Sequence, residues 1–145
     1  MTLHIDISRF LPSDVASKEV MALLAESVGN PTDSELEKLV ATCNPADYPA
    51  LWIASVFHRP IGVMRLDSQN RSNCTITHIA VDANLRGRGI GRKLIEFIRD
   101  DLDFRQVEAE TDSDAIGFYQ ACGFKVESIQ QNSYSIQRYK CTFRF

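Results

Sequence analysis

One short stretch constrains the fold more than any other part of the chain. Three glycines alternate with arginine and isoleucine in Arg86-Gly87-Arg88-Gly89-Ile90-Gly91. Residues 75–81, before it, are rich in β-branched side chains and predict a strand, whereas 90–102 has helical periodicity. Glycine lets a ligand come close to the backbone, and the first N–H groups of a helix have no intrahelical acceptor. With the positive end of the helix dipole and the arginines, these groups predict a phosphate-binding loop.

The spacing of the glycines excludes two common phosphate-binding motifs. A P-loop ends in Gly-Lys-Ser/Thr, but Gly91 is followed by Arg92 and Lys93, with no hydroxyl group for a magnesium ion. A dinucleotide-binding loop has the spacing G-x-G-x-x-G, whereas the spacing here is G-x-G-x-G. The loop therefore indicates a different phosphorylated ligand.

The pattern R-x-x-G-x-G, at 86–91, resembles the signature loop of the GNAT superfamily of acyl-CoA-dependent N-acyltransferases. The downstream segment F-Y-Q-A-C-G-F, at 118–124, is similar to the Y-x-x-x-G-F segment of that superfamily. The resemblance covers the chain from about Leu51 to its end. It implies that loop amides bind the CoA pyrophosphate, whose space a branched side chain at Gly89 or Gly91 would occupy, and that the preceding strand pairs with the pantetheine. The implied cofactor-binding residues are Ile79, Ala80, Val81, Arg86, Gly87, Arg88, Gly89, Ile90 and Gly91.

The order of predicted elements indicates one α/β domain, 1–145, with a mixed sheet of about seven strands and four helices on both faces. The resemblance implies a GNAT-like fold with a splayed central pair of strands. A change of apolar phase near Gln137 and Arg138 predicts a β-bulge in the last strand. Strands are predicted at 3–10, 51–57, 61–66, 75–81, 106–111, 124–130 and 134–145, and helices at 14–28, 34–43, 90–102 and 114–122.

Charge and cysteine usage narrow the classes of partner. Sixteen Lys and Arg against nineteen Asp and Glu leave a net charge of −3, which argues against a nucleic-acid partner. The cysteines form no C-x-x-C pair and have no histidine at zinc-ligand spacing, so we expect neither a disulfide nor a metal. The segment M-T-L-H-I-D-I has no positive, apolar leader, which predicts a cytoplasmic protein without a membrane partner.

The candidate general acid is Tyr119, four residues before Gly123. The resemblance assigns this position to a tyrosine near the CoA sulfur, and a phenol with a pKa of about 10 can return a proton to a thiolate. The alternative is a core aromatic residue, with either Tyr119 or its neighbour Phe118 packing inward. Asp112 stands where the family often has an asparagine that contacts CoA; an aspartate there can still cap the next helix, from 114.

The general base is less well defined. Several GNAT members have a glutamate on the central strand, and the corresponding residue here is Thr75, which cannot accept a proton. His78 is a possible base because it is the only titratable residue on that strand. Strand alternation places it on the opposite face from Thr75, Thr77, Ile79 and Val81, so a structural role is an equal alternative. Glu110, on the neighbouring strand, could act as a base through water.

The GNAT resemblance of these residues implies an N-acetyltransferase that transfers an acetyl group from acetyl-CoA, as co-substrate, to the primary amine of a small molecule or peptide by direct attack. A catalytically weak or inactive CoA-binding regulatory module is the alternative, favoured by the missing strand glutamate and disfavoured by Tyr119. No extra apolar tunnel indicates long-acyl transfer, and the acidic balance argues against DNA binding. The expected acceptor segments, 29–32 and 131–133, are polar and uncharged, and the resemblance implies a possible homodimer through the last strands.

Overall fold

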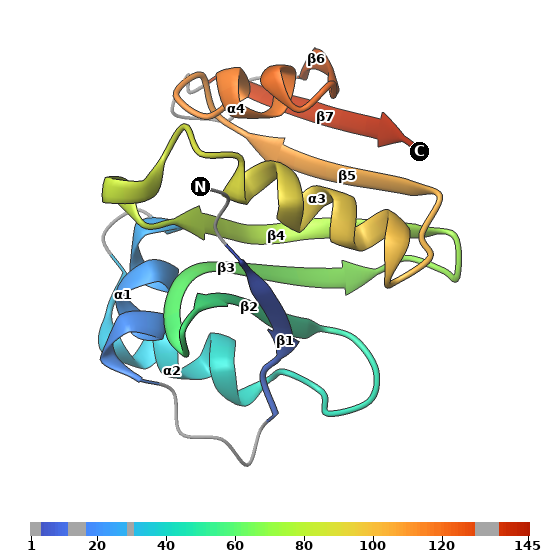
Figure 1. Cartoon of the computed structure of the whole chain (residues 1–145). Helices are drawn as coiled ribbons and strands as arrows, with labels where there is room; N and C mark the ends of the chain where they lie inside the picture. Colours follow the sequence, from blue (N-terminus) through green and yellow to red (C-terminus); the bar gives the residue numbers. More distant parts are fainter. Residues whose placement is uncertain (1–3, 12–16, 29–30, 130–136) are drawn as a thin grey trace.

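A single seven-stranded sheet forms the centre of the protein (Figure 1). The computed structural model describes residues 4–11, 17–28, 31–129 and 137–145. The strand order is β1-β2-β3-β4-β5-β7-β6, and neighbouring strands run antiparallel except β4 and β5, which run parallel. The strands are β1 (Asp6–Arg9), β2 (Ala50–Val56), β3 (Arg59–Ser68), β4 (Asn73–Val81), β5 (Gln106–Thr111), β6 (Lys125–Ile129) and β7 (Arg138–Arg144).

Four helices cover both faces of this sheet, as the sequence predicts. They are α1 (Lys18–Glu26), α2 (Asp33–Ala41), α3 (Ile90–Asp100) and α4 (Ile116–Ala121), and a 3-10 turn, η1 (Ala83–Leu85), precedes α3. Hydroxyl groups begin the first two helices: Ser17 accepts from the N–H of Val20, and Thr32 from that of Glu35. Within the described residues no helix has the length and apolar character needed to cross a membrane.

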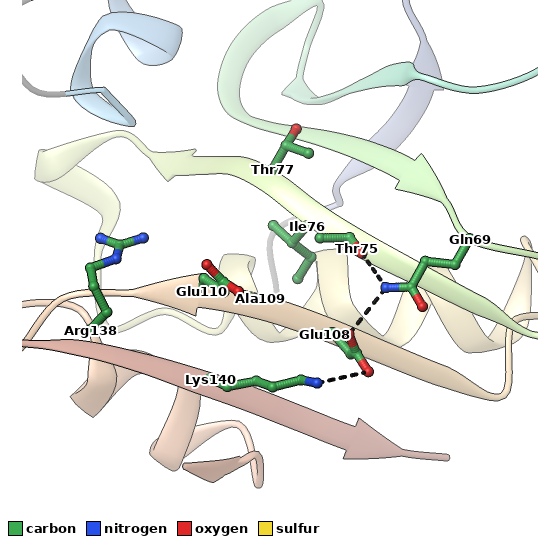
Figure 2. A pocket seen from close by; sticks show the side chains of 9 residues that line it. All are labelled: Gln69, Thr75, Ile76, Thr77, Glu108, Ala109, Glu110, Arg138 and Lys140. Carbon is green, nitrogen blue, oxygen red and sulfur yellow. Dashed lines mark hydrogen bonds and ion pairs between the residues drawn. The ribbon is translucent and has the colours of Figure 1, made fainter. Parts of the chain in front are cut away.

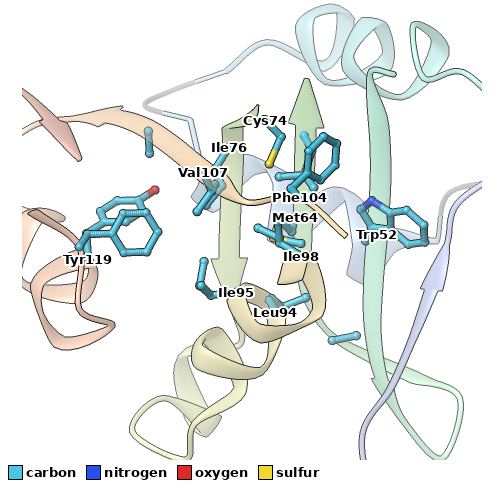
Figure 3. Close-up of a cluster of buried hydrophobic side chains, with 14 of the residues drawn as sticks. Trp52, Met64, Cys74, Ile76, Leu94, Ile95, Ile98, Phe104, Val107 and Tyr119 are labelled. Carbon is cyan, nitrogen blue, oxygen red and sulfur yellow. The ribbon is translucent and has the colours of Figure 1, made fainter. Parts of the chain in front are cut away.

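The apolar core is divided by the sheet. Leu51 of β2 packs with α1 and α2, whereas the next residue, Trp52, belongs to a larger cluster with α3 and α4. That larger cluster contains Met64, Leu94 and other buried side chains from β3, α3 and β5 (Figure 3). Because successive residues of a strand point to opposite faces, this division confirms two layers of helices on one sheet.

Several predicted boundaries differ from the observed ones. The predicted starts at 3 and 14 lie outside the described residues, and so do 130–136, where two predicted strands end and begin. β7 pairs in unbroken register with β5 from Tyr139 to Arg144 and with β6 from Arg138 to Thr142, so the described part of the last strand carries no bulge. α4 begins at Ile116 rather than at 114, because Asp112 accepts a hydrogen bond from the N–H of Asp114 and closes a turn ahead of the helix.

A β-bulge occurs instead where β3 meets β4. Arg65 pairs with His78, but the next residue of β3, Leu66, pairs with Ile76. Thr77 is therefore an extra residue on β4. Such a residue bends its strand and changes the phase of side-chain alternation.

The change of phase corrects the predicted orientation of His78. Ile76 and Ile79 both pack in the cluster beneath α3, although three positions separate them. Thr75 and His78 alternate with these two residues, so both lie on the side of α1 and α2. The prediction that His78 faces away from Thr75 and Thr77 is wrong, because simple alternation does not allow for the bulge; its separation from Ile79 is correct.

Arg65 connects the bulge to α2. This side chain is only 9% exposed and donates to the carbonyl of Leu39, 3.3 Å from its Nε, near the C-terminal end of α2. The same guanidinium donates to the hydroxyl groups of Thr42, at 3.1 Å, and Thr77, at 3.2 Å. A helix end carries unsatisfied carbonyl groups and partial negative charge, so a buried cation is well placed there.

Replacement of Arg65 by leucine is expected to lower the free energy of unfolding by about 2 kcal/mol, because three part-buried hydrogen bonds from a charged donor are lost. Urea denaturation measures this change. Arg71→Leu, at an exposed position in the β3–β4 turn, is the matched control and should have little effect. Equal losses in the two variants would contradict a stabilising role for the Arg65 contacts.

Candidate functional site

The central strands separate at their C-terminal ends. The parallel register of β4 and β5 runs from Asn73 with Gln106 to Ile76 with Ala109 and does not extend to the last residues of either strand. Beyond that point β4 remains paired with β3 and β5 with β7. The β4 backbone at 79–81 therefore has one edge that no described strand occupies, which is the splayed pair that the resemblance implies.

The glycine loop connects the end of β4 to α3. Gly87 and Gly89 have φ angles of 80° and 82°, in the left-handed region that side chains disfavour. A Cβ at either position would meet no atom within 4 Å, so backbone conformation rather than space requires glycine there. The first backbone hydrogen bond of α3 joins the N–H of Lys93 to the carbonyl of Gly89. The N–H groups at 90–92 consequently have no acceptor within the helix and can bind an anion.

Gly91 is required for a different reason. A Cβ at this position would lie 2.5 Å from Cε2 of Phe118, so the helix start packs directly against the aromatic ring on α4. The prediction that a side chain at Gly91 would occupy the pyrophosphate space is therefore wrong, because such a side chain would point at the ring of Phe118. The glycine joins the loop to the helix that carries Tyr119.

Two of the basic residues at the loop are engaged with the protein. Arg86 lies 3.4 Å from the carboxylate of Glu26 on α1, and Arg92 donates to the carbonyl of Ala121 at the end of α4. Among the described residues, Arg88 and Lys93 form no ion pair or side-chain hydrogen bond. These two side chains are the ones available to an anionic ligand at the loop.

Tyr119 lies inside the larger core cluster and is 5% exposed. Its ring makes edge-on contacts with Phe118 and Phe124, at centroid distances of 5.1 and 5.2 Å. In Figure 3 its hydroxyl group points toward the sheet. Burial raises the pKa of Tyr119, so the phenol stays protonated at neutral pH. A group of this kind can donate a hydrogen bond to a thiolate more readily than it can give up its proton.

The side chain of His78 lies beside the hydroxyl group of Thr77. The hydroxyl of Thr77 accepts from Arg65 and donates to the carbonyl of Arg65 at 3.1 Å. His78 Nδ1 is 2.9 Å from the same hydroxyl group, and the tautomer of the ring decides which of the two atoms donates. Burial and the charge of Arg65 lower the pKa of His78, which keeps the ring neutral. A neutral imidazole can accept a proton at one of its two ring nitrogens.

A polar cavity of about 340 Å³ lies over residues 75–77 of β4 and 108–110 of β5, around the point where the two strands separate and on the face opposite to α3 (Figure 2). Thr75 lies in it and accepts a hydrogen bond from Gln69, so the position expected for a base holds a satisfied hydroxyl. The charged side chains that line it are Glu108, Glu110, Arg138 and Lys140. Sequence reasoning identified only Glu110 among them; the alternation of polar residues along 106–110 was the available signal.

The expected acceptor segments at 29–32 and 131–133 lie mostly outside the described residues. The other predicted residues lie on the two faces of the sheet. The backbone of Ile79–Val81, the glycine loop and Tyr119 lie on the α3 and α4 side, and His78 and Glu110 lie on the other.

A family model described as an acetyltransferase (GNAT) domain matches residues 47–126, which is more than half of the chain. The chain belongs to the GNAT acetyltransferase family. It is 30% identical over 118 residues to the peptidyl-lysine N-acetyltransferase YjaB of Escherichia coli, covering 75% of this chain and 76% of that protein. It is 35% identical over 66 residues to the ribosomal protein bS18-alanine N-acetyltransferase of Salmonella typhimurium, covering 41% of this chain.

The alignment spans 45% of the length of the Salmonella typhimurium protein, and 27% of the length of a further relative, the chloroplastic GCN5-related N-acetyltransferase 2 of Arabidopsis thaliana. Solved structures of the GNAT family support the fold. A GNAT family acetyltransferase from Elizabethkingia anophelis, with acetyl-CoA bound, aligns with a TM-score of 0.68 and 17% identity, covering 97% of this chain and 98% of that one. At this identity the likeness shows that the two proteins share the fold.

Gly91→Ala should lower the free energy of unfolding by about 1–3 kcal/mol, because the new methyl group overlaps the ring of Phe118. Part of the loss should return in the double variant Gly91→Ala/Phe118→Leu, where a smaller side chain faces the methyl group. The matched control is Gly117→Ala in α4, where a Cβ meets nothing within 4 Å and the change should be neutral or slightly stabilising. Urea denaturation measures the free energy of unfolding of each variant. The packing explanation would be refuted if the loss in the double variant equalled the sum of the losses in Gly91→Ala and Phe118→Leu.

The pKa of His78 should lie below the ordinary value of about 6.5 for a histidine. An NMR titration of the imidazole measures it. The pKa of His78 should rise in Arg65→Leu, because the positive charge that helps to lower it is removed. Because the folded state favours the neutral ring, His78 should reduce stability as the pH falls from about 6.5 toward the folded pKa. A titration at or above the ordinary value would contradict the described environment.

Proposed function

We propose that this protein is an N-acetyltransferase that moves an acetyl group from acetyl-CoA to a primary amine. The observation that supports it most is the unpaired edge of β4 at 79–81, placed directly before an anion-binding glycine loop. N–H groups at 90–92, with Arg88 and Lys93, would hold the pyrophosphate, and the β4 edge would align the pantetheine as a further strand. The acetyl-CoA bound to the Elizabethkingia anophelis protein agrees with this assignment.

In the proposed reaction the amine nitrogen forms a bond to the carbonyl carbon of the thioester, and the carbon–sulfur bond breaks. A backbone N–H of the β4 edge is available to the developing oxyanion, an interaction that contributes a few kcal/mol in other enzymes. Tyr119 would hydrogen-bond to the departing thiolate. The high pKa that burial gives to Tyr119 suits it to stabilise the thiolate without a lasting phenolate.

Two residues are candidates for removal of the ammonium proton. The lowered pKa of His78 keeps its ring neutral, and Glu110 lies in the polar cavity. They lie on the same face of the sheet, so either can serve an amine that enters there. A CoA-binding module without turnover is a second candidate function, and Thr75 in place of a strand glutamate is the observation that favours it.

The test of the proposed function is a calorimetric titration with acetyl-CoA, followed by an assay of thiol release with a panel of amines. Wild type should bind acetyl-CoA at micromolar concentrations, and Gly89→Val should not, because a β-branched residue cannot adopt the observed φ of 82° without strain. Tyr119→Phe should keep the binding and lower kcat by roughly 10- to 1,000-fold. Binding without turnover for every amine would favour the regulatory module, and no binding would reject both functions.

A further inference from the structure

The polar cavity over β4 and β5 holds two acidic and two basic side chains, and only one of each is neutralised within it. Glu108 is 3.7 Å from Lys140 Nζ, and its carboxylate also accepts a hydrogen bond from Gln69 at 3.1 Å. Figure 2 draws both contacts as dashed lines. Glu108 and Lys140 therefore satisfy one another and form one wall of the cavity.

Glu110 and Arg138 are not satisfied in this way. In the part of the chain that the structure describes, neither side chain makes an ion pair or a side-chain hydrogen bond. Glu110 is exposed, Arg138 is half-buried, and both line the cavity. A carboxylate and a guanidinium that share a cavity without partners can each bind a group of opposite charge.

The sheet sets the spacing of these two charges. Glu110 of β5 is directly opposite Lys140 of β7, and Arg138 is two residues from Lys140 on the same face of β7. Diagonal neighbours of this kind in an antiparallel pair are about 7 Å apart at their Cβ atoms. Figure 2 shows both side chains extending on the same side of the sheet. One small molecule can therefore contact both.

The position of the pair relates it to the proposed acetyl transfer. Glu110 follows Ala109, the last residue of β5 that pairs with β4, so it stands where the two strands begin to separate. Thr77, at the bulge, lines the same cavity beside His78. An acceptor held here would lie next to both candidate bases.

We propose that the acceptor is a small zwitterionic amine of the amino-acid type, with its ammonium group beside Glu110 and its carboxylate bound by Arg138. This inference rests on the proposed acetyltransferase function. A cavity of about 340 Å³ is at the lower end of the size range of small-molecule sites, which fits such a compound. A peptide with a blocked or distant C-terminus has no carboxylate to offer to Arg138 at this distance from its amine.

The test compares acceptors that differ only in the carboxylate. Acetyl-CoA binding is first measured by calorimetry, and thiol release is then followed with free amino acids, the corresponding amino acid amides, and short peptide amides with a free N-terminus. For the preferred side chain, wild-type kcat/KM should be roughly 10- to 100-fold higher for the acid than for the amide, since a charged hydrogen-bonded contact is lost. Arg138→Gln should abolish this ratio.

Arg144→Gln provides the matched control. Arg144 lies on the same face of β7 but outside this cavity, where it donates to Gln106. This variant should keep the acid-to-amide ratio of the wild type, and thermal unfolding of both variants checks that they fold. An unchanged ratio in Arg138→Gln would overturn the role of the guanidinium.

The outcomes separate the two proposals. Equal rates with acids and amides, or preference for the peptide amides, would overturn the zwitterionic acceptor while the acetyltransferase function stands. Acetyl-CoA binding with no transfer to any of the three acceptor groups would also reject this acceptor class. Absence of acetyl-CoA binding would reject the proposed function, and the acceptor proposal with it.

Discussion

The extra residue at Thr77 in β4 is the feature on which most of the site depends. It lets one strand present Ile76 and Ile79 to the same apolar cluster while His78 turns to the other face. The parallel register with β5 ends one residue before it, at Ile76. Arg65 stabilises this irregular point by hydrogen bonds that extend to the end of α2. The backbone distortion is therefore compensated by a buried cation rather than by further strand pairing.

The two faces of the sheet differ in chemistry as a result. Beneath α3 and α4 the surface of β4 and β5 is apolar, and it contains Tyr119 in a setting that keeps its proton bound. On the opposite face the same strands carry hydroxyl groups and charges around a cavity. The α1 and α2 cluster that packs on this face lies over β2, β3 and the end of β4, with Leu51, Val63 and Ala80, and includes no described residue of β5 or β7.

Sequence patterns predicted the features that depend on neighbouring residues. The strand and helix order, the glycine loop between a strand and a helix, and the helical position of Tyr119 all follow from local periodicity and from the properties of glycine. The orientation of His78 and the reason for Gly91 could not be predicted in this way. The first depends on the register between two strands, and the second on a contact with Phe118 that only the folded chain creates. Arg138 was missed for the same reason, since its relation to Glu110 arises from the pairing of β5 with β7.

β4 and β5 separate after Ile76 and Ala109, and this point of separation is shared by both faces of the sheet. The glycine loop approaches it from the side of α3, and the charged cavity approaches it from the other. Two molecules could therefore reach a common point without crossing each other's path. An arrangement of this kind imposes no order of arrival or departure, so an acetylated product could leave while CoA is still bound, or the reverse.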